Sequence, residues 1–307
     1  LNTLGMKYAG NTGTGTFTAT SASGKTGTSG SVVINAGTAA KFHIDGSPTQ
    51  TAGTSQNLTI TALDAAGNTA TLYTGSKSLT FSGANSSPNP VTVPTVKNSS
   101  GTVVNFGTAT AITFTSGVAT VSGSNNGVMT LYKAETAIIS ATDGTISSSG
   151  SDRLTVTVSP GALGKFAFVL ATPQTNAAAF TGVNTLTAQD NWGNTVTTFD
   201  ASASNVTITT TLTGTVSGLG TGGNNVLNRA TDFSSGVANM TALGMTYTGV
   251  SGTGTFTATS ASKTGTSGSV VMNPGILTSF GLTLATPQTV GVTFTATSTL
   301  TAKDISG

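Results

Sequence analysis

Residues 60–68 read Ile-Thr-Ala-Leu-Asp-Ala-Ala-Gly-Asn, an alternating segment that is followed at once by a turn. Residues 186–194 read Leu-Thr-Ala-Gln-Asp-Asn-Trp-Gly-Asn, and residues 300–304 repeat the first half as Leu-Thr-Ala-Lys-Asp. Apolar residues at every second position predict a strand with one buried face, and Asp-x-x-Gly-Asn is typical of a turn in which glycine adopts positive φ. The same strand and turn therefore recur along the chain.

Longer similarities show that the repeating unit has the size of a domain. Leu4–Ser23 and Leu243–Ser262 share most of their residues, which corresponds to two repeats of about 120 residues each. Strand patterns stop at Gly or Pro at each boundary, and linkers of one or two residues leave little freedom between domains. We expect four parts: 1–36, the C-terminal strands of a partial domain; 37–159 and 160–274, two complete domains; and 275–307, the N-terminal strands of a partial domain. The two partial domains together are shorter than one repeat, so we expect a segment of a longer array.

The pattern between these repeats also favours strands. No segment sustains the i, i+3, i+4, i+7 spacing of an amphipathic helix, and Thr, Val and Gly dominate the composition. Turn signals recur at Ala65–Asn68, Ser116–Gly117, Asp143–Gly144, Trp192–Asn194 and Ser235–Gly236. The predicted fold class is all-β, with tandem antiparallel β-sandwich domains.

Three of these elements carry a family resemblance. The hairpins at 64–69 and 190–195, the Ser-Gly-Val-Ala segments that begin at Ser116 and Ser235, and the strand at 253–260 follow one another in a fixed order. In that order they resemble bacterial immunoglobulin-like (Big) tandem repeats of the invasin and intimin type. The resemblance covers essentially the full chain. It implies extracellular domains at the cell surface that project a functional tip or build a coat such as an S-layer.

The composition argues against several classes of function. Charged residues make up 7% of the chain, the net charge is +2, and there is no Cys. We therefore expect no nucleic-acid partner, no thiolate metal site, and no membrane span in this segment, because no apolar stretch approaches about 20 residues. The chain holds one His, His43, which alternates with Phe42 and Ile44 and should face solvent. Paired titratable groups are scarce, so we expect no enzyme.

The recurrent turns are the principal candidate site. Asp64, Gly67 and Asn68 form the first turn, and Asp190, Gly193 and Asn194 form the second. The structural interpretation is that each Gly takes positive φ while each Asp accepts hydrogen bonds from backbone N–H groups. The alternative is a calcium site with Asp64 and Asp190 as ligands, although Ca²⁺ prefers six to eight oxygens and acidic partners are few. We predict structural turns, with no catalytic residue, no metal and no cofactor.

Two further features could contact a partner. Trp192, the single Trp, lies in a hairpin where the equivalent residues are Ala66 and Ser306. It is a candidate for packing against a neighbouring domain or for stacking on a sugar. Residues 85–105 are an insertion with three prolines, which predicts an irregular segment and a candidate recognition loop.

Repetition favours a structural role over a specific binding role, because a stalk needs many similar domains. We expect a segment of a repetitive bacterial extracellular protein, namely a stalk, filament or surface-layer building block. Its partners would be neighbouring domains or copies of the same protein. The alternative is an adhesin or carbohydrate-binding array whose hairpin loops contact a cell-surface glycan, a host or a substratum.

Overall fold

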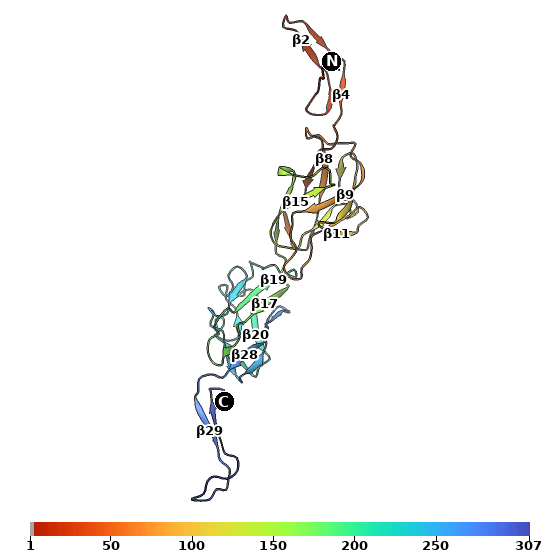
Figure 1. The fold of residues 1–307 in the computed structure, drawn as a ribbon. Coiled ribbons are helices and arrows are strands. Elements are labelled where there is room, and N and C mark those ends of the chain that lie inside the picture. Colours follow the sequence, from red (N-terminus) through yellow and green to blue (C-terminus); the bar gives the residue numbers. More distant parts are fainter. Residues whose placement is uncertain (1–2) are drawn as a thin grey trace. The chain divides into compact units, whose positions relative to one another are not determined.

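The computed structural model describes residues 3–307. These form two compact units, the first ending at Ser159 and the second beginning at Pro160 (Figure 1). Apart from one 3₁₀ turn, η1 (Gly150–Asp152), every regular element within these residues is a β-strand. The predicted all-β class is confirmed. In the part of the chain that the structure describes, no helix has the length and hydropathy to cross a membrane.

The first unit begins with two short hairpin-like pairs. In these, β1 (Gly13–Gly15) pairs with β4 (Val32–Ile34), and β2 (Thr18–Thr20) pairs with β3 (Thr26–Thr28), both antiparallel. The strands that follow are β5 (Lys41–Asp45), β6 (Thr49–Thr51), β7 (Ser55–Asn57), β8 (Thr59–Leu63), β9 (Gly75–Ser82), β10 (Thr95–Lys97), β11 (Val103–Asn105), β12 (Ala109–Phe114), β13 (Val118–Ala119), β14 (Val128–Thr130), β15 (Thr136–Thr142) and β16 (Leu154–Ser159).

These strands form three sheets around one core. Their orders are β12-β9-β15-β16-β6, β11-β10-β14-β7 and β13-β8-β5, and all pairs are antiparallel except β16 with β6. Alternation decides which side chains face inward: Ile60 and Ala62 of β8 are buried, while Thr59 and Thr61 are half-buried. The rings of Phe42, Tyr73 and Phe114 pack mutually, with centroids 5.0 to 6.0 Å apart. Burial of each such Phe or Ile side chain contributes about 1.5–3 kcal/mol to the free energy of folding.

The insertion at residues 85–105 differs from the sequence prediction. It contains β10 and β11, which pair in register, so its second half is a regular hairpin rather than an irregular loop. Its start is held by Glu135, whose two carboxyl oxygens accept hydrogen bonds from the backbone N–H and the side-chain amide of Asn85, both at 2.7 Å. Val96 of β10 is fully buried. The turn sequence Asn-Ser-Ser-Gly at residues 98–101 was the local signal for this hairpin, and the three preceding prolines concealed it.

The second unit repeats this arrangement with shorter strands. They are β17 (Lys165–Val169), β18 (Gln174–Thr175), β19 (Thr185–Gln189), β20 (Val206–Thr210), β21 (Gly214–Ser217), β22 (Val226–Leu227), β23 (Val237–Asn239), β24 (Thr246–Gly249), β25 (Gly252–Gly254), β26 (Phe256–Ser260), β27 (Lys263–Thr266), β28 (Val270–Asn273), β29 (Ser279–Thr283) and β30 (Thr299–Lys303). The sheets are β17-β19-β23, β18-β28-β25, β22-β20-β26-β27, β21-β24 and β29-β30.

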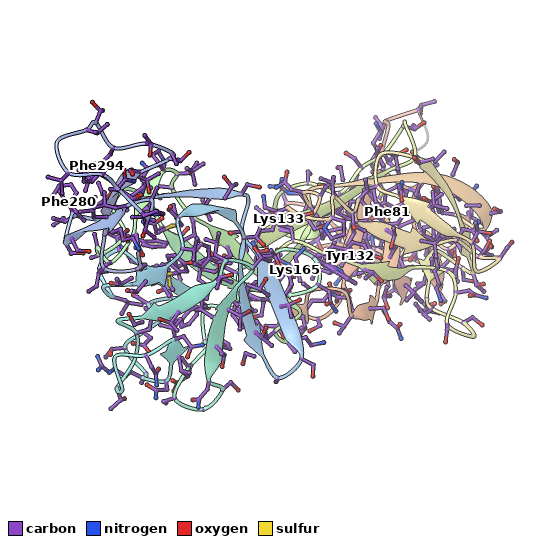
Figure 2. All side chains as sticks on the ribbon, turned by 90° about the horizontal axis from the view of Figure 1, so that it is seen from below. Phe81, Tyr132, Lys133, Lys165, Phe280 and Phe294 are labelled. Carbon is purple, nitrogen blue, oxygen red and sulfur yellow. The ribbon has the colours of Figure 1, made fainter. Side chains whose placement is uncertain are left out.

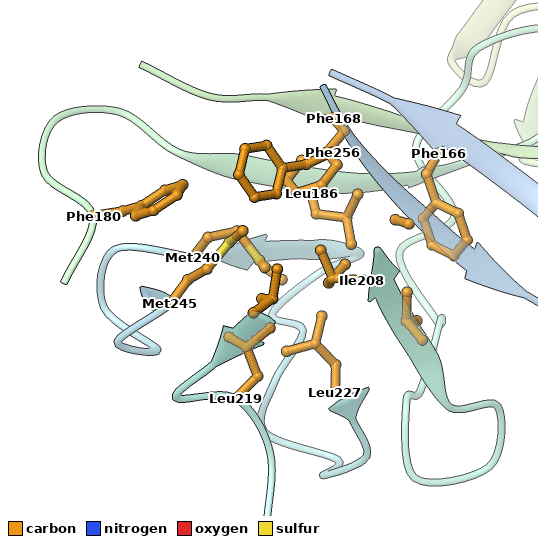
Figure 3. Packing of buried hydrophobic residues seen from close by; sticks show 14 of the residues in the cluster. Phe166, Phe168, Phe180, Leu186, Ile208, Leu219, Leu227, Met240, Met245 and Phe256 are labelled. Carbon is orange, nitrogen blue, oxygen red and sulfur yellow. The ribbon is translucent and has the colours of Figure 1, made fainter. Parts of the chain in front are cut away.

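The core of this unit lies between its sheets (Figure 3). Phe166 and Phe168 of β17 and Leu186 of β19 face Phe256 and Ile208 from the opposite sheet, and all five are buried. A glycine permits the close approach of β27 to β17, because a Cβ on Gly265 would collide with the backbone carbonyl of Phe166. The identity of this residue is therefore fixed by packing between sheets.

Residues 275–307 show the same sequence pattern without the same burial. The antiparallel pair β29–β30 corresponds to β17–β19. Yet Phe280 is 62% and Leu300 66% exposed, whereas Phe166 and Leu186 are 4% and 0% exposed. Phe280 and Phe294 extend from this segment in Figure 2. Burial at these positions therefore depends on partner strands that residues 160–274 contain. The four-part division of the chain stays a prediction.

We expect Gly265→Ala to lower the free energy of unfolding of the second unit by about 1–3 kcal/mol, because the added Cβ overlaps the Phe166 carbonyl. The matched control is Gly27→Ala, at the equivalent position of β3, where a Cβ would meet nothing within 4 Å. Denaturant unfolding of both variants checks this. An equal loss of unfolding free energy in both variants, relative to the wild type, would contradict the prediction.

Candidate functional site

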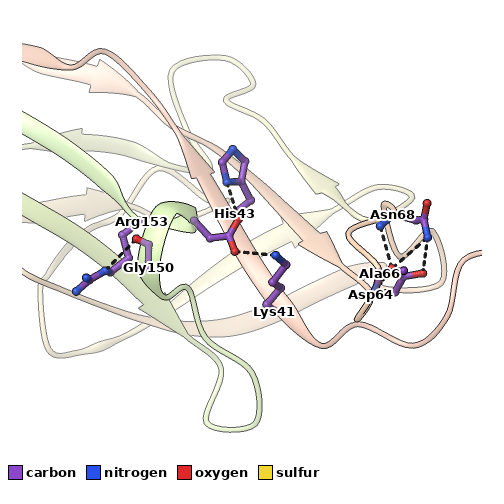
Figure 4. Close-up of polar contacts among 8 residues, drawn as sticks. Lys41, His43, Asp64, Ala66, Asn68, Gly150 and Arg153 are labelled. Carbon is purple, nitrogen blue, oxygen red and sulfur yellow. Dashed lines mark hydrogen bonds and ion pairs between the residues drawn. The ribbon is translucent and has the colours of Figure 1, made fainter. Parts of the chain in front are cut away.

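The hairpin at residues 64–68 is closed by the side chain of Asp64, which is 5% exposed at the end of β8. Its Oδ1 accepts hydrogen bonds from the N–H groups of Ala66 and Asn68 at 2.9 and 2.8 Å (Figure 4). Gly67 has φ +89°, and its N–H donates to the Asp64 carbonyl at 3.1 Å. Both features of the predicted turn are present.

The hairpin at residues 190–194 has the same construction. Asp190 is 2% exposed, and its Oδ1 accepts the N–H groups of Trp192 and Asn194, both at 2.9 Å. Gly193 has φ +83°, and the Asn194 amide donates to Asp190 Oδ2 at 2.8 Å. Two turns with different intervening residues therefore share one geometry, because the backbone and the Asp determine it.

The second carboxyl oxygen of each Asp has a partner that the sequence analysis missed. It accepts the N–H of the glycine with which the chain enters the same repeat. The three pairs are Gly37 with Asp64 at 2.9 Å, Gly161 with Asp190 at 2.9 Å, and Gly275 with Asp304 at 2.7 Å. The signal was a glycine at every boundary, which the pattern analysis had treated only as a breaker of strands.

These hydrogen bonds stabilise the ionised carboxylates. The N–H of Gly37, the Asn68 side chain and the turn N–H groups outweigh the opposing effect of burial and lower the pKa of Asp64 to about 2. At Asp304, the Asn176 amide and the N–H groups of Gly275 and Ser306 lower the pKa below its usual range.

The donor set does not fit calcium. Asp64 Oδ1 already accepts two N–H groups, and Oδ2 accepts Gly37 N–H and the Asn68 amide, at 2.9 and 3.1 Å. A cation would have to displace these donors and find several further oxygens. Among residues 3–307, no three His, Cys, Asp or Glu side chains form a group that could hold a metal ion.

Lys41, His43 and Asp152 form a connected group of polar side chains (Figure 4). Lys41 Nζ lies 2.8 Å from Asp152 Oδ2, and the His43 ring nitrogens lie 3.1 Å from Asp152 Oδ1 and 3.2 Å from Asp45 Oδ1. The Lys41 contact, assisted by His43, lowers the pKa of Asp152. His43 is on the face opposite Phe42, as alternation requires, but it is half-buried rather than fully solvated. The network joins β5 to η1.

Trp192 is half-buried in its hairpin, where its backbone N–H donates to the turn carboxylate of Asp190. The two roles predicted for its side chain, packing against a neighbouring domain and stacking on a sugar, stay predictions.

We expect Gly67→Val to destabilise the first unit by about 1–3 kcal/mol, because a β-branched residue is strained at positive φ. No atom lies within 4 Å of the added Cβ, so the loss isolates backbone strain. Gly67→Asn, which tolerates the left-handed region, is the control and should lose much less. The same ranking is expected at Gly193. Thermal or denaturant unfolding measures both, and a harmless Val would contradict the assignment.

Removal of the Asp190 carboxylate deprives the N–H groups of Gly161, Trp192 and Asn194 of their acceptor. We expect Asp190→Ala to lower the free energy of unfolding of the second unit by about 1–3 kcal/mol. A chelator should leave the melting temperature of the wild type unchanged. A chelator effect on the wild type that is absent from Asp190→Ala would instead identify a metal site.

The low pKa of Asp64 predicts a defined pH dependence. Because the folded pKa lies below the usual 3.8, the carboxylate stabilises the first unit fully above about pH 5, and this contribution is lost as the pH falls toward 2. Asp64→Asn should remove that part of the acid sensitivity. Unfolding of both proteins across this range measures the difference, and parallel pH profiles would overturn the prediction.

No protein-family model matches the chain, and no curated protein matches it. Similar solved structures include surface layer protein SbsC, domains 4–9, with 17% identity and a TM-score of 0.24, covering 88% of this chain and 37% of that chain. Domains 4 and 5 of the same S-layer protein match with 20% identity and a TM-score of 0.25, covering 78% and 100%.

The β-glucuronidase of Parabacteroides merdae matches with 10% identity and a TM-score of 0.24, covering 75% of this chain and 24% of that chain. The chain thus spans little more than a third of the first of these structures. At these TM-scores, none of the likenesses carries an argument about function.

Proposed function

We propose that this chain is a structural segment of a repetitive extracellular protein of the bacterial surface, acting as part of a stalk, filament or surface layer. One observation carries the proposal: the acidic hairpin binds the entry glycine of its own repeat at three places along the chain. A device that sets where each repeat begins serves a protein whose repeats must follow one another in a defined way.

We also propose that the role is not catalytic. The 307 residues include nine Asp and Glu and one His. The described carboxylates at 64, 190 and 304 are occupied by N–H donors, and the Asp152 carboxylate is occupied by Lys41 and His43. Groups held in this way stabilise turns and strand contacts, and they lack the freedom to exchange protons with a substrate.

Single-molecule pulling on the chain by its ends tests the structural role. Two separate hydrophobic cores predict two cooperative unfolding events, one for each compact unit. Extension without such events would contradict a segment that resists mechanical force. Electron microscopy of the purified chain at increasing concentration then distinguishes a filament or layer, which should give ordered assemblies, from a stalk, which should stay dispersed.

One cleft favours a second function, ligand binding by an adhesin-like domain. Its volume is about 340 Å³, and Tyr73, Lys77 and Asp143 contribute to its lining. The Tyr73 hydroxyl donates to Asp143 at 2.6 Å, and Lys77 Nζ lies 4.7 Å from the centre of the Tyr73 ring. A glycan-array screen with Lys77→Ala as control tests it: binding to a defined sugar that the variant loses would support this function.

A further inference from the structure

In the first unit, the acidic hairpin contacts a loop that precedes it by more than fifty residues. The Asn68 amide donates to the carbonyl of Gly10 at 2.9 Å, and the N–H of Thr12 donates to Asn68 Oδ1 at 3.1 Å. One side chain thus binds both a backbone acceptor and a backbone donor of the loop at residues 10–12. Recognition through the backbone depends on the shape of the loop and not on its side chains.

In the second unit, the equivalent loop meets the equivalent hairpin. Residues 249–251 correspond to residues 10–12 in the long similarity, and residues 304–307 correspond to the start of the hairpin at Asp64. A cleft of about 250 Å³ lies between the two segments and is lined from both sides. The same pair of elements therefore faces each other at two places in the chain.

Asn176 bridges this second contact and is 2% exposed. Its Oδ1 accepts the N–H of Gly249 at 2.9 Å, while its amide donates to Asp304 Oδ2 at 2.7 Å and contacts Ser306 Oγ at 3.0 Å. Asp304 Oδ2 also accepts the N–H of Gly275. A single carboxyl oxygen thus holds both the linker and a residue of the preceding strands.

We propose that the acidic hairpin is a docking element for the preceding repeat of the same chain. The recognition residues are Asn68 in the first hairpin and, at the second contact, Asn176 of the repeat that docks. The inference rests on the proposed structural function and names the partner of the hairpin. That partner is the loop of the preceding repeat, residues 10–12 or 249–251, together with the buried amide of Asn176 at the second contact. The linker between the partners is a residue or two long, so docking costs little chain entropy. The Asp304 carboxylate, the one charged group in the second contact, already accepts N–H donors from Asn176, Gly275 and Ser306, so the contact needs no cation.

Amide hydrogen exchange of the full chain tests the docking. Asn176→Asp sets a second carboxylate against Asp304, and like charges at hydrogen-bond distance repel. At neutral pH we expect exchange at the N–H of Gly275 to rise about tenfold or more, the loss expected when a hydrogen bond to a charged group breaks. Exchange at the N–H of Ile208 in the core strand β20, which donates to the Asn225 carbonyl, should stay unchanged and show that the sandwich remains folded.

Acid rescue separates docking from a general loss of stability. Lowering the pH protonates one member of the new carboxyl pair, which can then donate to the other, so protection at Gly275 in Asn176→Asp should return. Asn176→Ala should lose protection without this rescue. Asn57→Asp, on the exposed strand β7, is the matched control and should behave as the wild type.

The contact between Asn68 and residues 10–12 offers an independent test. Asn68→Ala should raise exchange at Thr12, while the N–H of Phe42 in the core strand β5 stays protected. Wild-type exchange at Gly275 and Thr12 in all variants, or loss of protection on adding a chelator to the wild type, would overturn the proposal. These outcomes do not depend on pulling or microscopy, so docking can fail while the structural function stands.

Discussion

The carboxylate that directly follows β8 or β19 is the interaction on which the surrounding structure depends. The turn N–H groups have no partner in the strand ladder, and at Asp64 and Asp190 one carboxyl oxygen accepts them. The other oxygen accepts the entry glycine. A single side chain therefore closes the hairpin and determines where the chain enters the repeat.

With so few charges, the sheets obtain their polar surface from hydroxyl groups. Thr18 and Thr28 lie 3.0 Å apart across β2 and β3, and Thr257 and Thr266 lie 3.0 Å apart across β26 and β27. The two hydroxyl groups of such a pair form a hydrogen bond across the strands, and they keep the outward face polar without ionised groups. The acidic side chains at 64 and 190 instead hold turns and linkers, and Asp152 binds Lys41 and His43.

Local patterns predicted the parts whose causes are local. Alternation located the strands around Ile60 and Leu186, and the need for positive φ located Gly67 and Gly193. The sequence could not predict the partners of these elements. A hydrogen bond from an entry glycine to an Asp about thirty residues later leaves no periodic signal in the sequence. For the same reason, Asn176 was indistinguishable from any other polar residue in an Asn-rich chain.

The sequence by itself determined the strand content, the turn chemistry and the repetition, since each follows from residues adjacent in the chain. Only the tertiary structure decided which side chains meet: Phe166 and Phe168 are buried against Phe256 and Ile208, which lie in the opposite sheet. It also decided that β27 needs Gly265 to pass close to Phe166. Both depend on which strands lie opposite, and that proximity arises only when distant segments pack together.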